Sequence, residues 1–304
     1  MQIIQGTTDF TLSQKSVVTI GKFDGIHLGH QKLFDRVLIQ KKRGITSVIF
    51  SFDPVPEAFF GQKAVKGLMS KEEKLAAFEK MGIDVLIEFP LNKETAATEP
   101  EYFVREYLTK KLQAAVIIAG TDISFGNKGA GNAALLLELS AECGYQVEKV
   151  RIGGEEVSST LTRETIRKGD MKKAALLLGS PYPVCGIVAH GRQLGRKLGM
   201  PTVNLLPPVE KLLPPNGVYY SYVWFQDRRY PAISNVGYKP TVSDGQVVGV
   251  ETYLYGFTKD LYGKEITVEL LDFKRAEKKF DGVEALKEQM SRDIAEGMVF
   301  HGLS

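Results

Sequence analysis

Two of the four histidines in the chain, His27 and His30, lie three residues apart in a glycine-rich segment, residues 21–30. This segment is expected to join a strand to a helix, where free backbone N–H groups and the helix dipole attract anions. Gly25 and Gly29 would let the main chain approach a phosphate closely. Histidine pairs at this spacing also arise for structural reasons. At this junction, both imidazoles can reach one α-phosphate and stabilise the charge that builds up in nucleotidyl transfer.

A second polar segment, Ser158-Ser159-Thr160 followed by Arg163, is expected at the start of another helix. Three hydroxyls and an arginine at such a position suit a polyphosphate. Taken alone, the hydroxyls are more often a simple helix N-cap. The segment is therefore a candidate for phosphate binding only if it lies close to the histidine pair in the fold.

A third group of polar residues lies in the second half of the chain. Gly191 and Gly195-Arg196-Lys197 form a glycine-rich, basic stretch that can fold over phosphates. Thr202 and Asn204 are two residues apart, so on an extended segment their side chains point the same way. A hydroxyl and an amide carbonyl are hard oxygen ligands that suit Mg²⁺, although the same residues alone are typical of a turn. Glu251 is a carboxylate in an otherwise apolar strand pattern, where it is either a surface residue or a functional one.

The elements that position the first two groups alternate between strands and helices. Short apolar runs predict buried strands, and amphipathic stretches predict helices between them. The expected strands are 17–20, 47–50, 85–89 and 115–119, and the expected helices are 31–42, 71–81 and 101–112. This repetition predicts a parallel sheet with helices on both faces.

The pattern changes near residue 180. Two helical stretches, 162–169 and 171–178, precede a break at Gly179–Pro183. Short alternating segments then indicate an antiparallel barrel or sandwich, at 184–189, 217–225, 230–236, 247–254 and 265–273, with a closing helix over 282–297. We therefore expect two domains, residues 1–180 and 181–304, as the length of 304 residues also suggests.

Composition restricts the class of protein. The net charge of +3 is too small for a nucleic-acid surface but is compatible with nucleotides as ligands. Cys143 and Cys185 lie in apolar surroundings and are expected to be reduced. No signal-type N-terminus or membrane-length apolar run is recognisable, so a cytoplasmic protein without membrane or nucleic-acid partners is expected.

The chemical motifs together resemble the bacterial bifunctional riboflavin kinase/FAD synthetase family. Residues 21–30 match its G-x-F-D-G-x-H-x-G-H signature, and residues 158–163 are similar to its S-S-T-x-x-R segment. Residues 120–126 look like its flavin-contacting loop. Residues 186–204 resemble the G-x-V-x-H-G and G-R-x-L-G-x-P-T-x-N signature of riboflavin kinase. Further matching segments are residues 215–219, 235–241, 250–254, 261–264 and 275–280.

The resemblance implies a Rossmann-like nucleotidyltransferase domain, a six-stranded antiparallel riboflavin kinase barrel and a C-terminal helix. It implies that riboflavin is phosphorylated by ATP to FMN in the barrel and that FMN is adenylylated by a second ATP to FAD in the first domain. Glu251 would be the kinase base, His27 and His30 the catalytic groups of adenylyl transfer, and Thr202 and Asn204 the Mg²⁺ ligands. The nucleotide- and flavin-binding residues would be Gly21, Phe23, Asp24, Gly25, Gly29, Asp122, Phe125, Ser158, Ser159, Thr160, Arg163, Gly191, Gly195, Arg196, Lys197, Asn235 and Arg275.

The chain departs from the family pattern at three positions, and the first two of them, Val55 and Leu161, keep an alternative open. Val55 replaces a usual histidine, Leu161 replaces a frequent arginine, and Lys22 replaces a frequent asparagine. The nearest alternative is a monofunctional riboflavin kinase with a degenerate first domain. A flavin- or nucleotide-binding regulatory protein and a nucleotidyltransferase for another phosphorylated substrate are the others. A monomer or weak homo-oligomer is expected.

Overall fold

The computed structural model describes residues 1–61, 66–151, 157–191, 194–240 and 246–303. The chain forms two compact units, Met1–Ser159 and Thr160–Ser304. No helix within the described ranges is both long and apolar enough to cross a membrane.

The first unit is built on a parallel sheet of six strands in the order β1-β4-β3-β2-β5-β6. Every neighbouring pair in it is parallel. The strands are β1 Gln2–Gln5, β2 Ser16–Ile20, β3 Thr46–Asp53, β4 Val85–Pro90, β5 Ala114–Gly120 and β6 Gln146–Val150. Strands β2 to β5 are buried apolar runs, as a sheet covered on both faces requires.

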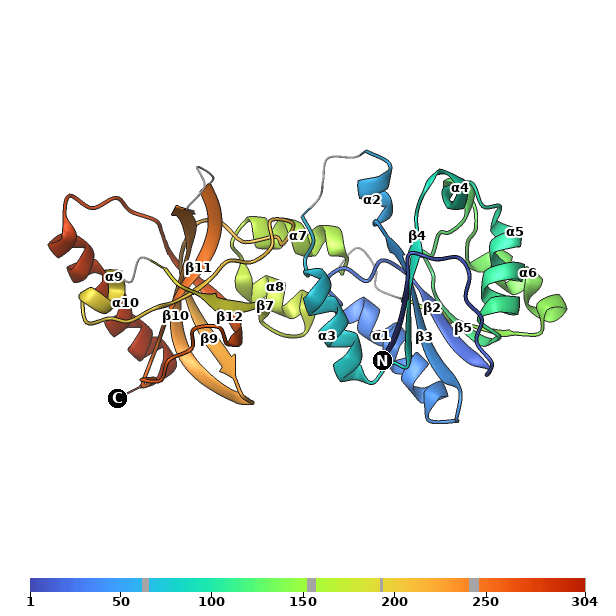
Figure 1. Ribbon diagram of the computed structural model, residues 1–304, viewed down its shortest axis with the longest axis horizontal. Helices are drawn as coiled ribbons and strands as arrows, with labels where there is room; N and C mark the ends of the chain where they lie inside the picture. Colours follow the sequence, from blue (N-terminus) through green and yellow to red (C-terminus); the bar gives the residue numbers. More distant parts are fainter. Residues whose placement is uncertain (62–65, 152–156, 192–193, 241–245, 304) are drawn as a thin grey trace. The chain divides into compact units, whose positions relative to one another are not determined.

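Helices cover both faces of this sheet (Figure 1). They are α1 Leu28–Lys41, α2 Pro56–Phe59, α3 Lys71–Met81, α4 Lys93–Ala96, α5 Pro100–Tyr102 and α6 Ala133–Cys143, with a π-helix η1 Phe103–Lys111 and a 3₁₀ turn η2 Asn127–Gly129. Helices α1 and α3 pack on one face, where Phe34 and Phe78 meet Phe23. Helices α5 and α6 lie on the other face with η1, where Phe103 and Leu136 join the second core cluster.

The strand order reverses between β2 and β5. From β2 the chain continues through β3 and β4 to one side, whereas β5 and β6 lie on the other. Ligands of open α/β sheets bind outside the carboxyl ends of the strands at such a switch point. The loop with His27 follows β2 and the loop with Asp122 follows β5, so the fold brings these two sequence motifs to one edge.

The second unit is a closed antiparallel barrel with strand order β10-β11-β8-β7-β12-β9. Its strands are β7 Tyr182–Ala189, β8 Val203–Leu205, β9 Gly217–Phe225, β10 Arg228–Pro240, β11 Gln246–Leu254 and β12 Glu265–Ala276. Its helices are α7 Ser159–Arg167, α8 Met171–Leu178, α9 Leu194–Lys197 and α10 Val283–His301. The expected fold class is confirmed, and the antiparallel half is a barrel rather than a sandwich.

Helix α10 packs along one side of the barrel (Figure 1). Its Ile294 packs against Val218, Ile233 and Tyr255. The Tyr255 hydroxyl donates to the Ile294 carbonyl at 2.7 Å. A Cβ on Gly297 would lie only 2.1 Å from that hydroxyl oxygen, so glycine is needed where the helix meets the barrel. This close approach fixes the helix whose other half borders the cavity described below.

The first unit ends at Ser159, and helix α8 packs against β7 and β12. The division of the chain thus assigns α8 to the barrel unit. The domain boundary that we expect at residue 180 stays a prediction.

Candidate active sites

The loop after β2 is tightly folded and depends on two glycines. A Cβ on Gly21 would lie 2.8 Å from the ring of Phe23, and one on Gly25 would lie 2.5 Å from Leu68. Gly25 has φ +86°, and Phe23 and Ile26 also have positive φ, at 51° and 44°. Positive φ is costly for residues with a side chain, so the loop is held in this shape by its packing. This loop, residues 21–27, joins the end of β2 to the first turn of α1.

His27 and His30 meet at this turn. His27 is the N-cap of α1, and its Nδ1 accepts the backbone N–H of His30 at 3.4 Å. The two rings stack with centroids 3.7 Å apart. Because Nδ1 acts as an acceptor, the proton of the neutral His27 ring is on Nε2, where it can serve as a donor. The structure therefore brings both predicted histidines together at a helix N-terminus.

Both imidazoles are held neutral. His27 is only 3% exposed, and burial lowers its pKa from 6.5 to about 4 although the Asp122 carboxylate acts in the opposite direction. Burial, together with the neighbouring His27, lowers the pKa of His30 to about 3. Neutral N–H groups in a dehydrated site are preorganised donors for a phosphate. Because the Asp122 carboxylate acts on the pKa of His27, the loop after β5 lies close to the loop after β2.

Asp24 organises the surrounding loops through its hydrogen bonds. Its carboxylate accepts the backbone N–H groups of Leu68 and Met69 at 2.8 and 3.3 Å. Its backbone carbonyl accepts the Ser159 hydroxyl at 2.8 Å. Ser159, from the predicted phosphate-binding segment, is thus beside the histidine loop.

For the other predicted residues of this site, the structure gives a position in the fold but no contact with the histidine pair. Ser158 precedes α7, while Thr160 and Arg163 lie on α7 in the second unit, and their action on the same ligand stays a prediction. Gly29 is buried in α1. Phe125 is 3% exposed, and its ring packs on Phe103, so the structure places it in the core. A flavin contact by Phe125 also stays a prediction.

Sequence reasoning missed a partly buried ionic cluster near the ends of β3 and β4. Lys71 pairs with the buried carboxylate of Glu88 at 2.8 Å, and Lys74 donates to the Ser51 hydroxyl at 3.5 Å. Burial lowers the pKa of Lys74, while the carboxylates of Glu88, Asp24 and Asp53 act against it. The sequence contained one sign of this cluster, because Glu88 is a charged residue inside an otherwise apolar strand. The cluster lies close to Asp24, whose carboxylate acts on the pKa of Lys74.

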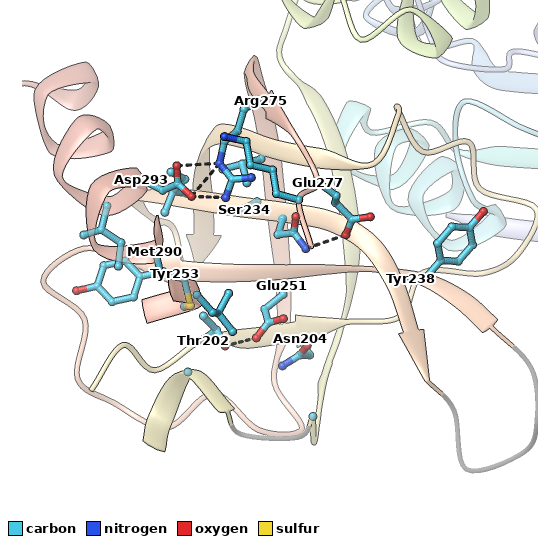
Figure 2. A pocket seen from close by; sticks show the side chains of 18 of the residues that line it. Thr202, Asn204, Ser234, Tyr238, Glu251, Tyr253, Arg275, Glu277, Met290 and Asp293 are labelled. Atoms are coloured by element: carbon cyan, nitrogen blue, oxygen red, sulfur yellow. Dashed lines mark hydrogen bonds and ion pairs between the residues drawn. The ribbon is translucent and has the colours of Figure 1, made fainter. Parts of the chain in front are cut away.

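The barrel unit has a cavity of about 550 Å³ between the outer face of the barrel and α10 (Figure 2). Its lining includes most of the residues predicted for this half of the chain, namely Gly191, Gly195, Thr202, Asn204, Asn235, Glu251 and Arg275. Arg196 is exposed and is not among the lining residues. The Lys197 side chain lies outside the described part of the structure, so its predicted role is neither supported nor opposed.

Glu251 lies at the centre of the polar wall of this cavity. Strand register pairs it with Asn204 on β8 and with Asn235 on β10, so the three side chains share the outer face of the barrel. Thr202 donates its hydroxyl to Glu251 Oε1 at 2.6 Å. Figure 2 shows Thr202, Asn204 and Glu251 as one group. The three residues predicted for metal binding and proton transfer are therefore adjacent.

The two glycines of the predicted phosphate loop lie against this group. A Cβ on Gly191 would be 2.5 Å from the Asn204 amide nitrogen. A Cβ on Gly195 would be 2.4 Å from the Met200 carbonyl and 3.1 Å from the Thr202 hydroxyl. Backbone and polar side chains can approach each other here only because these positions are glycine.

Sequence reasoning missed three charged residues of the cavity lining, Glu277, Lys278 and Asp293. Asp293 on α10 binds the Arg275 guanidinium, and Glu277 accepts the Asn216 and Asn235 amides at 3.1 and 3.4 Å. Tyr253, Met290 and neighbouring apolar side chains complete the wall. Among the side chains that the structure describes, no group of three or more His, Cys, Asp or Glu could hold a metal ion.

Comparison with known proteins assigns both units. Residues 9–161 match the FAD synthetase family model, and residues 178–300 match the riboflavin kinase model. The bifunctional riboflavin kinase/FMN adenylyltransferase of Bacillus subtilis is 34% identical, covering 93% of this chain and 92% of that protein. Its namesakes in Listeria monocytogenes and Escherichia coli are 32% and 31% identical, covering 97% and 100% of this chain and 95% and 99% of those proteins.

This chain belongs to the bifunctional riboflavin kinase/FMN adenylyltransferase family. The family expected from the motifs is thereby confirmed, and each of its two modules is matched in this chain. The fold is also similar to a crystal structure described as a macrolide-efflux protein from Streptococcus pneumoniae, with a TM-score of 0.84, 30% identity and coverage of 97% of this chain and 98% of that one. Because both family modules are present, the bifunctional interpretation is favoured over a kinase alone.

Proposed function

We propose that this family member makes FAD from riboflavin in two ATP-dependent steps. The barrel transfers the γ-phosphate of ATP to riboflavin and releases FMN and ADP. The first unit joins FMN to the adenylyl group of a second ATP and releases pyrophosphate. The observation that carries this proposal is the convergence of Glu251, Thr202 and Asn204 in one cavity of a riboflavin kinase barrel.

In the kinase step, Glu251 is proposed as the base. The 5′-hydroxyl of riboflavin loses a proton as it attacks the γ-phosphate, and a positioned carboxylate can accept that proton. The Thr202 hydroxyl donates to one carboxylate oxygen of Glu251 at 2.6 Å, which fixes the orientation of the proposed base. Gly191 and Gly195, which lie against Asn204 and Thr202, are proposed to bring backbone N–H groups to the phosphates.

The same group of residues fits Mg²⁺. The donors are a hydroxyl on Thr202 and an amide oxygen on Asn204, which are hard oxygen ligands placed beside a carboxylate. We propose these two residues as the metal ligands. When bound, the ion would neutralise phosphate charge.

In the adenylyl transfer step, the stacked pair of His27 and His30 is proposed to donate to the α-phosphate of ATP. Gly25 and the N-terminus of α1 supply the close backbone approach. The Ser159 hydroxyl, held on the Asp24 carbonyl, is proposed to lie beside the phosphates of the same nucleotide. The phosphate of FMN is already an anionic nucleophile at neutral pH, so this step needs no base.

A single assay tests both steps. The purified chain is incubated with riboflavin, ATP and Mg²⁺, and FMN, FAD and ADP are separated by chromatography over time. We expect FMN to appear first and FAD to follow, with both products suppressed by EDTA. Accumulation of FMN without FAD would instead identify a kinase with an inactive first unit. Tight flavin binding without any product would identify a binding protein and refute the proposal.

A further inference from the structure

Two consecutive cations at the end of β12 bind one carboxylate on α10. Arg275 Nε lies 3.0 and 3.1 Å from the two carboxylate oxygens of Asp293, and Arg275 Nη2 lies 2.5 Å from Oδ2. Lys274 Nζ lies 3.1 Å from Oδ1. Successive side chains of a strand normally point to opposite faces. Here the register of β12 shifts between Phe273 and Arg275, and such a bulge re-aims the side chains beside it.

The carboxylate is buried and fully engaged. Asp293 is 5% exposed, and Gln289 on the preceding turn of α10 donates to its Oδ1 at 3.1 Å. Burial alone would raise the pKa of Asp293, but the hydrogen bonds from Arg275 and Lys274 hold that pKa below its ordinary value. The forked, two-point contact also fixes the plane of the Arg275 guanidinium. Asp293 is therefore ionised. Together with the Ala276 carbonyl, which accepts from Arg275 Nη1 at 2.9 Å, it fixes where the Arg275 side chain points.

Asp293 lies between the part of α10 that packs on the barrel and the part that lines the cavity. Towards the C-terminus, the helix is anchored on the barrel through Tyr255 and through His301 Nε2, which is 3.0 Å from the Ala232 carbonyl. Towards the N-terminus, Leu286 and Met290 line the cavity, on the same helical face as Asp293. Figure 2 shows the Arg275–Asp293 pair on the cavity wall, apart from the group of Thr202 and Glu251.

Resting on the kinase reaction proposed above, we propose that Asp293 is a positioning residue for riboflavin binding. It acts through Arg275 by holding the guanidinium in the wall of the cavity. The same contact ties the N-terminal half of α10, which carries Leu286 and Met290, to the end of β12. Removing its charge releases Arg275 into the cavity and loosens Leu286 and Met290. Glu251 and Thr202 belong to the separate group, so the chemical step at saturating riboflavin should change far less than binding.

The test measures riboflavin-dependent FMN formation at saturating ATP for Asp293→Asn, Arg275→Gln and the double variant. The fluorescence of Trp224 in β9 is measured on the same preparations and reports whether the barrel is folded. We expect each single variant to raise the KM for riboflavin by about tenfold and to change kcat by less than about threefold. The double variant should be no worse than the single variants, because the two residues act as one unit.

Glu296→Gln is the matched control, because Glu296 also pairs with Lys274 from α10 but is largely exposed. It should leave the KM unchanged. A normal KM in Asp293→Asn, or additive effects in the double variant, would overturn the inference. If Trp224 fluorescence shows that the barrel of Asp293→Asn is unfolded, Arg275→Lys carries the test. Arg275→Lys keeps the positive charge but loses the two-point contact of the guanidinium with Asp293. An unchanged KM for riboflavin in this variant would refute the inference. Absence of FMN formation by the unaltered chain would instead refute the proposed function.

Discussion

The buried histidines predict a specific dependence of stability on pH in the first unit. The pKa of His27 falls from 6.5 to about 4 on folding, and that of His30 falls to about 3. Between pH 6.5 and these values the unfolded chain binds two protons that the folded chain does not. Stability therefore decreases as the pH falls through this window and is fully retained above pH 6.5.

The magnitude follows from the size of the two shifts. Each pH unit inside the window costs about 1.4 kcal/mol per group. At pH 5, where both imidazoles are still neutral in the folded chain, each histidine costs about 2 kcal/mol, or about 4 kcal/mol for the pair, relative to pH 8. A variant with both histidines replaced by asparagine should lack this part of the pH dependence, because asparagine does not titrate.

The assay compares urea unfolding of the two proteins at pH 8 and pH 5. Trp224 is the one tryptophan of the chain and lies in β9, so its fluorescence follows the barrel unit. Hydrogen exchange of amides in β2 follows the first unit. We expect the loss of β2 protection at pH 5 to be about 4 kcal/mol smaller in the variant, with no difference at Trp224. Equal losses in the two proteins would refute the assignment of neutral, buried imidazoles.

Three further predictions concern activity. His27→Ala should lower FAD formation from FMN by about 10²–10³-fold and spare the kinase, because one phosphate donor is lost, and equal losses in both reactions would contradict separate sites. Glu251→Gln should slow riboflavin phosphorylation by about 10²–10⁴-fold while FMN is still adenylylated, and a normal kinase rate would remove Glu251 from the mechanism. Gly195→Ala places a Cβ 2.4 Å from the Met200 carbonyl, so it should displace the loop at Thr202 and reduce kinase activity without affecting FAD formation from FMN. Product chromatography measures all three.

The sequence was informative where local patterns determine structure. Apolar runs located β2 to β5 because strands covered on both faces must be apolar along their whole length. Alternation located five barrel strands, and the spacing of Thr202 and Asn204 indicated that their side chains point the same way. The three-residue strand β8, Val203–Leu205, was too short to show a periodicity of its own. It is defined by pairing with β7 and β11, which only the closed barrel reveals.

Contacts between distant residues could not be predicted. Asp293 lies 18 positions after Arg275, and the two meet because a bulge in β12 redirects the strand end towards α10. Lys74 on α3 donates to Ser51 on β3, which lies 23 positions earlier in the chain. The motif predicts that Phe125 contacts the flavin, which stays a prediction, but it gives no sign that the ring packs on Phe103. In each case a local pattern identifies a notable residue type but not the partner that determines its role.

The different chemistry proposed for the two sites explains their different residues. Riboflavin attacks through an alcohol, which must lose a proton, and the barrel provides a carboxylate on Glu251 that a Thr202 hydroxyl holds in place. FMN attacks through a phosphate that is already anionic, so this step needs no carboxylate as a base. The first unit instead offers His27 and His30, which burial keeps neutral and able to donate. Neutral donors stabilise developing charge without binding the substrate phosphate so strongly that the ground state gains as much as the transition state.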